Sequence, residues 1–131
     1  MGNPENILFV CVHNAGRSQM AEAFFNHLTA TTSRAQSAGT LPSDAVHSNV
    51  IAVMKEAGIN LESARPKILT EYMLEQATKV FTMGCLVTDA CPSALVVSED
   101  WGIEDPSGKP FETVRRIRDE IRDKVKELLS L

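Results

Sequence analysis

A cysteine and an arginine lie six positions apart in the stretch CVHNAGRS, residues 11–18. The residues between two such groups can wrap so that successive backbone N–H groups point inward at one oxyanion. Arg17 adds a planar guanidinium that can bind two oxygens of a tetrahedral anion, a geometry that lysine does not offer. The expected oxyanion-binding residues are Val12, His13, Asn14, Ala15, Gly16 and Arg17. This pattern indicates phosphate-like chemistry centred on Cys11.

Cys11 has the surroundings of a nucleophile. The loop amides, the arginine and the positive end of a helix starting near Ser18 all favour the thiolate, and Ser18 can donate a hydrogen bond to it. Asn14 and Gly16 tolerate the left-handed backbone that a tight loop needs. The alternative is a buried cysteine at a strand end beside an arginine in a surface turn. The strand–loop–helix context favours the catalytic interpretation.

Two further cysteines, Cys85 and Cys91, occur downstream in TMGCLVTDACPS, residues 82–93. On a continuous helix they would lie roughly 9 Å apart along the axis and point about 120° away from each other. A disulfide needs Cα atoms within about 7 Å, so the segment must be a loop, or must unwind, if the two are to pair. The alternative is that both are small buried apolar residues. Residues 85–91 are therefore expected to be mobile if the cysteines are redox-active.

Length and charge limit the classes of function. The chain has 131 residues, which we expect to form one domain over 1–131, and its net charge is −4. The sequence has no basic stripe, which argues against nucleic-acid binding, and no apolar run long enough to span a membrane. Its first residues do not resemble a signal peptide. We expect a cytoplasmic monomer, in which three cysteines are more typical of catalysis or redox chemistry than of structural bridges.

Apolar runs and helical patterns alternate along the chain. The patterns predict strands over 6–12, 34–40, 79–84 and 94–99, and helices over 18–30, 44–57, 70–77 and from Pro110 onward. Ser43 or Asp44 is the expected cap of the second helix and Gly58 its end. This alternation predicts an α/β fold with a parallel sheet covered on both faces. Its ligands are expected beyond the carboxyl ends of the strands, where Cys11, Gly39, Cys85 and Glu99 or Asp100 would meet.

The motifs CVHNAGRS, SAGT (37–40) and EDPSG (104–108) together resemble the low-molecular-weight protein tyrosine phosphatase superfamily over nearly the whole chain. Within it, the sequence looks most like the thioredoxin-coupled arsenate reductases. The motif QMAEA follows Ser18 where phosphatases usually have a proline, and no aromatic residue follows Asp105-Pro106. Cys85 and Cys91 fall where these reductases keep a redox pair, although their spacing is one residue shorter than the best-known pattern. The resemblance implies a three-layer α/β/α fold with four parallel strands.

The resemblance also implies an activity, the reduction of arsenate to arsenite. Its catalytic residues would be Cys11, Arg17, Ser18, Cys85, Cys91 and Asp105. Cys11 would attack arsenic, Asp105 would act as the acid, and the other two cysteines would end as a disulfide. No cofactor or metal is expected to be bound, phosphate or sulfate would compete with arsenate, and thioredoxin would be the external reductant. The composition of DPSG alone predicts only a turn, so the acid role of Asp105 depends on the resemblance.

Two other functions remain open. The same nucleophile, anion-binding loop (residues 12–17, called the cradle below) and acid would suit a phosphatase acting on phosphotyrosine or aryl phosphates. A thiol switch or metalloid sensor would use the cysteines without turnover.

Some members of the family bind potassium near the anion loop, and Asn14, Glu22 and Ser37 match parts of that site. Lys67 stands where an acidic ligand is expected, so its ammonium is a candidate to replace the cation.

Overall fold

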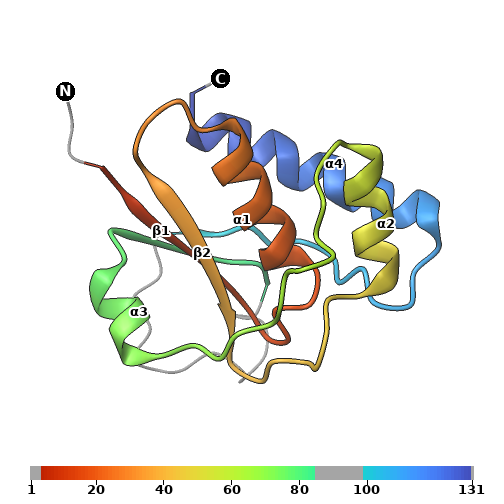
Figure 1. Cartoon of the computed structure of the whole chain (residues 1–131), viewed down its shortest axis with the longest axis horizontal. Helices are drawn as coiled ribbons and strands as arrows, with labels where there is room; N and C mark the ends of the chain where they lie inside the picture. Colours follow the sequence, from red (N-terminus) through yellow and green to blue (C-terminus); the bar gives the residue numbers. More distant parts are fainter. Residues whose placement is uncertain (1–3, 85–98, 131) are drawn as a thin grey trace.

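The computed structural model describes residues 4–84 and 99–130, and its centre is a sheet of four parallel strands (Figure 1). The strands are β1 (Asn6–Cys11), β2 (Arg34–Gly39), β3 (Lys79–Thr82) and β4 (Glu99–Asp100), arranged in the order β2-β1-β3-β4. All three neighbouring pairs are parallel, as the alternation of strands and helices predicts. Of the strand expected over 94–99, only residue 99 falls within the described part of the chain.

Strand β1 is buried on both faces because helices cover both faces of the sheet. Ile7, Phe9 and Cys11 belong to the larger apolar cluster, whereas Leu8 and Val10 belong to a smaller one on the opposite face. Successive side chains of a strand point to opposite faces, so a strand covered on both sides is apolar at nearly every position. The strand ends with Cys11 at the carboxyl edge of the sheet, which places the sulfur where parallel sheets bind ligands.

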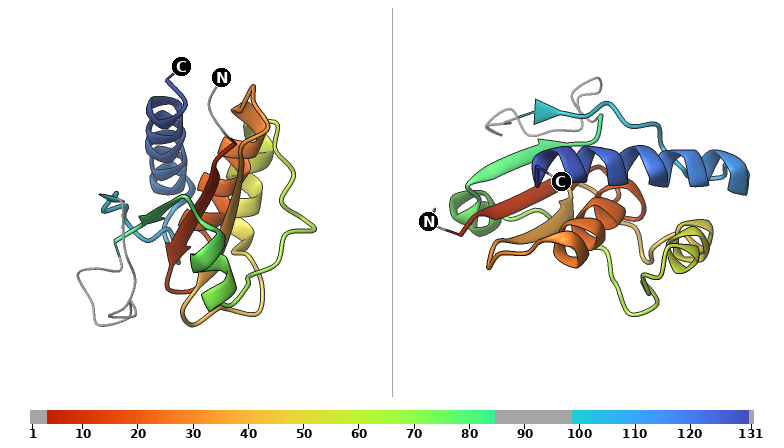
Figure 2. Two further views of the ribbon diagram at one scale, coloured as in Figure 1. Left: turned by 90° about the vertical axis from the view of Figure 1, so that its left-hand side faces the viewer. Right: turned by 90° about the horizontal axis from the view of Figure 1, so that it is seen from above.

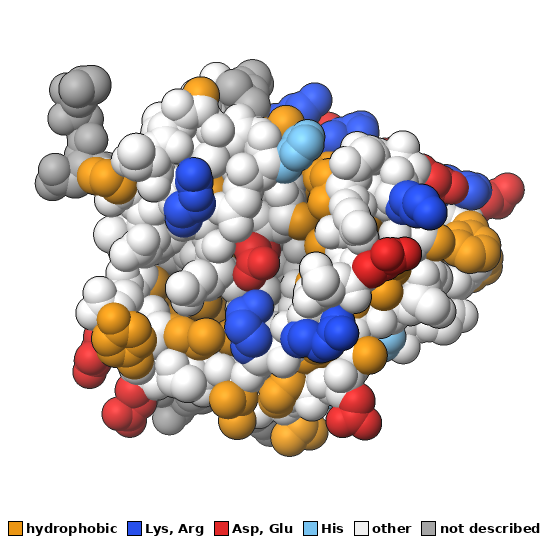
Figure 3. Space-filling view, viewed as in Figure 1, with side chains coloured by type: hydrophobic (Ala, Val, Ile, Leu, Met, Phe, Trp, Pro, Cys, Tyr) orange, Lys and Arg blue, Asp and Glu red, His pale blue; other side chains and the backbone are white. Residues whose placement is uncertain are grey.

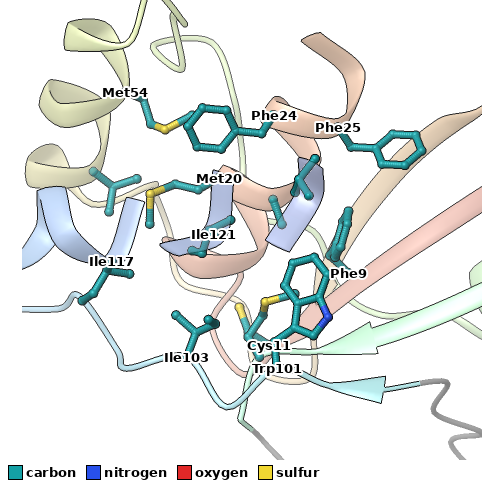
Figure 4. Packing of buried hydrophobic residues seen from close by; sticks show 14 of the residues in the cluster. Phe9, Cys11, Met20, Phe24, Phe25, Met54, Trp101, Ile103, Ile117 and Ile121 are labelled. Carbon is teal, nitrogen blue, oxygen red and sulfur yellow. The ribbon is translucent and has the colours of Figure 1, made fainter. Parts of the chain in front are cut away.

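The larger cluster lies between the sheet and three helices, α1 (Arg17–Leu28), α2 (Ser48–Glu56) and α4 (Phe111–Leu128). Helix α4 follows Pro110 and buries one stripe at helical spacing, formed by Val114, Ile117, Ile121 and Val125. Figure 4 shows Met20 and Phe24 of α1 meeting Met54 of α2, with Cys11 at the lower edge of the cluster near Ile103 and Trp101. The nucleophile candidate thus sits where the core meets the loops.

Helix α2 begins later than the sequence pattern predicts. Neither Ser43 nor Asp44 caps it; the helix starts at Ser48 with His47 as its N-cap. The preceding segment is held in a different conformation by backbone hydrogen bonds, since Ser43 N donates to His13 O and His47 N to Ala15 O. The end of the helix agrees with the prediction, because Gly58 adopts a positive φ of 82° just beyond it.

The opposite face of the sheet has a lighter cover. Helix α3 (Glu71–Gln76), capped by the Thr70 hydroxyl, packs Met73 and Leu74 on the smaller cluster. Figure 2 shows α3 apart from the other three helices. Acidic and basic side chains are mixed over the face seen in Figure 3. No helix in the described part of the chain is long and apolar enough to cross a bilayer.

Candidate active site

The loop between β1 and α1 is braced from outside by the segment that follows β2. The carbonyl oxygens of Val12, His13 and Ala15 accept hydrogen bonds from the backbone N–H groups of Leu41, Ser43 and His47, at 2.8, 3.0 and 2.9 Å. A peptide unit directs its C=O and N–H in opposite senses, so carbonyls bonded outward leave the amides available on the inner side. This is the arrangement that an oxyanion cradle needs. His13 follows the same pattern, with its ring Nδ1 3.1 Å from Leu41 O on the outside of the loop.

Cys11 is nearly fully buried, with 3% of its surface exposed, and two groups approach its sulfur. The hydroxyl Oγ of Ser18 lies 2.8 Å from Sγ, and Asn14 N donates to Sγ over 3.2 Å. Asn14 reaches this position with a positive φ of 49°, a conformation that asparagine adopts more readily than most residues. The contact with Ser18 and the left-handed backbone of Asn14 agree with the sequence analysis, which did not foresee the bond from Asn14 N. The left-handed backbone expected at Gly16 is wrong, since its φ is −149°.

The direction of the Ser18 hydrogen follows from the next bond in the chain of contacts. Asn14 Nδ2 donates to Ser18 Oγ over 2.7 Å. Asn14 Oδ1 in turn accepts from Lys67 N over 2.8 Å, and a backbone N–H can only donate, so the Asn14 amide cannot be flipped. A thiolate carries no hydrogen, so when Cys11 is ionised the Ser18 hydroxyl, whose oxygen accepts from Asn14, donates its own hydrogen to Sγ. A thiolate at this position therefore accepts two hydrogen bonds, one from Ser18 and one from Asn14 N.

Arg17 joins the cradle to two other segments. Its Nη1 donates to Met83 O over 2.8 Å and to Ile103 O over 3.0 Å. Its Nε and Nη2 make no hydrogen bond to a residue that the structure describes. These two nitrogens form the edge of a guanidinium that binds two oxygens at once, so the anion-binding edge is the one left available.

The loop that carries Asp105 docks directly on the cradle. A Cβ atom added to Gly16 would lie 2.8 Å from Pro106 Cγ, which shows how closely the two loops approach. Asn49 Nδ2 holds the other side by donating to Pro106 O over 3.1 Å. Asp105 itself is exposed, and its Oδ1 accepts from Ser107 N over 3.0 Å. It is thus a turn residue in the loop that docks on the cradle, and its role as acid stays a prediction.

Asp100, at the end of β4, binds the end of β3, a contact that the sequence pattern did not predict. Its Oδ1 accepts hydrogen bonds from the Thr82 hydroxyl and, over 2.8 Å, from Gly84 N. Gly84 has a φ of 116° and immediately precedes Cys85. Asp100 therefore fixes the backbone that leads out of β3.

The cluster proposed for a cation contains an ion pair. Lys67 Nζ lies 3.5 Å from Glu22 Oε1, which also accepts from the Ser37 hydroxyl over 3.0 Å. Among the described residues, no group of three or more histidine, cysteine or acidic side chains is placed to hold a metal ion. The predictions for Cys85 and Cys91 lie outside the described residues, so the relay between the cysteines stays a prediction.

Gln19 is a site residue that the sequence analysis missed. Its amide is buried at the start of α1 and donates to Asn14, and its only signal in the sequence was its place directly after Ser18. Glutamine is common in helices, and residue type alone does not distinguish a buried amide that orders a loop from an exposed one.

The chain is similar in sequence to named proteins. A sequence profile described as "Low molecular weight phosphotyrosine protein phosphatase" matches residues 6–131. A Halobacterium salinarum protein, provisionally named an arsenate reductase, is 39% identical over 127 residues, covering 93% of this chain and 89% of that protein. The arsenate reductase of Staphylococcus aureus (strain Newman) is 33% identical over 129 residues, covering 96% and 97%.

Solved structures share the fold. An arsenate reductase in the phosphate binding state has a TM-score of 0.84 at 30% identity, covering 96% of this chain and 97% of that one. A low molecular weight protein tyrosine phosphatase from T. tengcongensis has a TM-score of 0.82 at 29% identity, with coverages of 96% and 98%. A thioredoxin-dependent arsenate reductase from Corynebacterium glutamicum has a TM-score of 0.78 at 35% identity, with coverages of 99% and 63%. Both activities occur on this fold, so the choice between them depends on the chemistry of the site.

Proposed function

This chain belongs to the low molecular weight phosphotyrosine protein phosphatase family, and we propose that it reduces arsenate to arsenite. The observation that carries the proposal is the environment of Cys11: a buried sulfur with the Ser18 hydroxyl and Asn14 N within hydrogen-bond distance, beside the anion-binding edge of Arg17. Arsenate has the shape and charge of phosphate, so a cradle of this kind accepts either. The two cysteines at 85 and 91 supply what a phosphatase does not need.

The first step is a nucleophilic attack of the Cys11 thiolate on arsenic. The amides of the cradle and the Nε and Nη2 of Arg17 stabilise the negative oxygens as the bond forms. Asp105 protonates the departing oxygen, which leaves as water. Arsenic remains in its pentavalent state at this point, joined to the sulfur of Cys11.

The second step moves two electrons to arsenic. The Cys85 thiolate attacks the Cys11 sulfur, and the sulfur–arsenic bonding pair leaves with arsenite. Cys91 then attacks Cys85, which releases Cys11 as a thiolate and leaves a Cys85–Cys91 disulfide. Two thiols are oxidised for each arsenic reduced, so the electrons balance. An external dithiol such as thioredoxin reduces the Cys85–Cys91 disulfide back to two thiols and is itself oxidised to a disulfide, a role supported by the name of the C. glutamicum relative.

The direct test is arsenite formation from arsenate by the purified protein with thioredoxin, thioredoxin reductase and NADPH. Glutaredoxin with glutathione is the parallel assay. We expect steady NADPH consumption matched by arsenite only in the thioredoxin assay, with phosphate or sulfate as competing anions. If arsenite forms in neither assay while arsenate binds, the proposed activity is wrong.

Phosphatase activity on phosphotyrosine or aryl phosphates is the second candidate, supported by the similarity to the T. tengcongensis phosphatase. Replacing Cys91 by serine separates the functions. A reductase retains one turnover and stops at a Cys11–Cys85 disulfide, whereas a phosphatase keeps its full rate of hydrolysis. A thiol sensor would bind the anion and form no product in either protein.

A further inference from the structure

The Gln19 side chain lies inside a cage of oxygen atoms. Its Nε2 is 3.2 Å from Asn14 O, 3.1 Å from Asn14 Oδ1 and 3.1 Å from Arg65 O. All three are acceptors, so the amide must turn its NH₂ group toward them. Gln19 thus joins the cradle to the segment around Arg65, which lies outside it.

We infer that Gln19 is a positioning residue that controls the ionisation of Cys11 through Asn14 and Ser18. Gln19 and the Lys67 amide both donate to Asn14 Oδ1, which leaves Asn14 Nδ2 facing Ser18 Oγ. Ser18 then directs its hydrogen at Cys11. Without the donor at Gln19, Lys67 N is the one described group that donates to Asn14 Oδ1, so the amide is held less firmly against Ser18.

The unpaired oxygen of the Gln19 side-chain amide lowers the stability of the fold, which argues that glutamine has a role here beyond packing. Gln19 is 1% exposed, and its Oε1 is buried without a hydrogen-bond partner in the described part of the chain. An unpaired buried carbonyl oxygen destabilises the folded state, and an apolar side chain of similar size would avoid that penalty. Packing alone is therefore better served by methionine than by glutamine at this position.

The described segments around the loop also carry ionisable side chains, and the test must leave them unchanged. They are Arg17, Lys67, Glu22, Asp100, Asp105 and the His13 ring. Gln19→Met alters none of them, keeps the volume of the side chain and removes only the donor. A shift in the ionisation of Cys11 in this variant therefore reports on the hydrogen-bond chain.

The measurement is the rate of iodoacetamide alkylation of Cys11 against pH, read by peptide mass spectrometry. Tryptic cleavage after Arg17 yields residues 1–17, in which Cys11 is the only cysteine, so the other two thiols do not interfere. We expect Gln19→Met to raise the pH midpoint of alkylation by about one unit, a roughly tenfold lower thiolate fraction below both midpoints. Asn26→Ala is the matched control, because it removes two hydrogen bonds between α1 and Ala35 away from the site. Its midpoint should equal that of the wild type.

Coupling to Ser18 completes the test. In a Ser18→Ala background, Gln19→Met should add no further shift, because the path to the sulfur is already broken. An unchanged midpoint in folded Gln19→Met, or shifts that add fully in the double variant, would overturn the inference. If Gln19→Met does not fold, Gln19→Asn, which withdraws the donor by one methylene, is read by the same criteria. If neither variant folds, the role is structural and the inference is wrong.

The inference depends on the proposed function only in taking Cys11 as the nucleophile. Alkylation needs neither arsenate nor a reductant, so a chain that fails to reduce arsenate can still show the shift. Conversely, a wild-type protein that reduces arsenate while Gln19→Met keeps its midpoint would overturn the role of Gln19 alone.

Discussion

The sulfur of Cys11 is almost shielded from water and has two donors within hydrogen-bond distance, Ser18 and Asn14. A buried thiolate without such donors would be costly, because desolvation favours the neutral thiol. The Asn14 amide beside Ser18 is held by contacts from Gln19 and from the backbone of Lys67. Reactivity at this one atom is therefore determined by residues from two different segments.

Lys67 gives a prediction about monovalent ions. Its ammonium pairs with Glu22 over 3.5 Å. The ammonium therefore supplies the positive charge that a bound cation would otherwise supply beside Glu22. We expect arsenate reduction at equal rates in sodium and potassium buffers of the same ionic strength. Strong activation by potassium in the wild type would contradict this.

The charge-reversed variant Lys67→Asp is the comparison for that measurement. It removes the ammonium and adds a carboxylate oxygen beside Glu22, so two acidic groups then lie together. We expect its activity to be lower in sodium buffer and to recover in potassium buffer, as followed by arsenite formation.

At this scale the sequence predicted residue types well and their partners poorly. Cys11, Arg17 and Ser18 lie in one loop, so their spacing alone indicates that they meet. The bond from Lys67 N to Asn14, and that from Gly84 N to Asp100, join positions that only the folded sheet brings together. No local pattern encodes such contacts.

At the scale of the elements, two glycines allow neighbouring segments to approach the loop between β1 and α1 closely. A Cβ at Gly39, the last residue of β2, would lie 2.5 Å from Val12 O, a backbone atom of the cradle. A Cβ at Gly16 would meet the ring of Pro106 at 2.8 Å. The first neighbour belongs to the cradle itself, whereas the second belongs to a loop that can shift.

These contacts predict different outcomes for two alanine variants. Gly39→Ala should distort the cradle and abolish phosphate binding, because backbone cannot withdraw without breaking its hydrogen bonds. Gly16→Ala should keep phosphate binding and lower kcat at least about tenfold, because it moves Asp105 away from the leaving oxygen. Isothermal titration with phosphate and steady-state kinetics separate the two. Equal effects on binding in both variants would contradict the prediction.

Helices α2 and α4 are joined by an ion pair with a defined pH dependence. The Arg115 guanidinium, with help from Arg118, holds the pKa of Glu56 below its ordinary value of 4.5. A group with a lowered folded-state pKa stabilises the fold above its unfolded pKa and loses that effect as the pH falls through the folded value. We expect Glu56→Gln to lower the Tm slightly at neutral pH, with the difference from wild type closing below about pH 4.5.

The control for this titration is Glu75→Gln on α3. Glu75 is exposed and forms no ion pair within the part of the chain that the structure describes. The Tm of the Glu75→Gln variant should equal that of the wild type at every pH. A Glu56→Gln difference that persists at low pH would show that packing, and not the ion pair, joins the two helices.

For the whole molecule, we expect the two faces of the sheet to contribute unequally to stability. Among the described residues, α1, α2, α4 and most of the core cover one face, whereas α3 covers the other with a small cluster. The order of the elements in the sequence predicted this α/β architecture, because each strand and helix has its own periodic pattern. The start of α2 could not be predicted, since backbone bonds to the cradle from Ser43 and His47 override the local capping signal.

The inequality predicts different costs of core truncation. Ile117→Ala, at a fully buried position of α4, should lower the free energy of unfolding by about 2–5 kcal/mol. Leu74→Ala, at a partly buried position of α3, should cost about 1 kcal/mol. Urea unfolding followed by circular dichroism measures both. A larger loss for Leu74→Ala would mean that the lighter face dominates folding.

The number of N–H groups on the Arg17 side chain explains why a lysine would not serve at this position. A guanidinium carries five N–H groups, and the two on Nη1 are committed to Met83 O and Ile103 O. Three remain for the anion, two of them parallel. A lysine has three in total, so after binding Met83 O and Ile103 O it would have one N–H left for the anion and no parallel pair. Arginine can therefore bind the backbone of two neighbouring segments and two oxygens of the anion with one side chain.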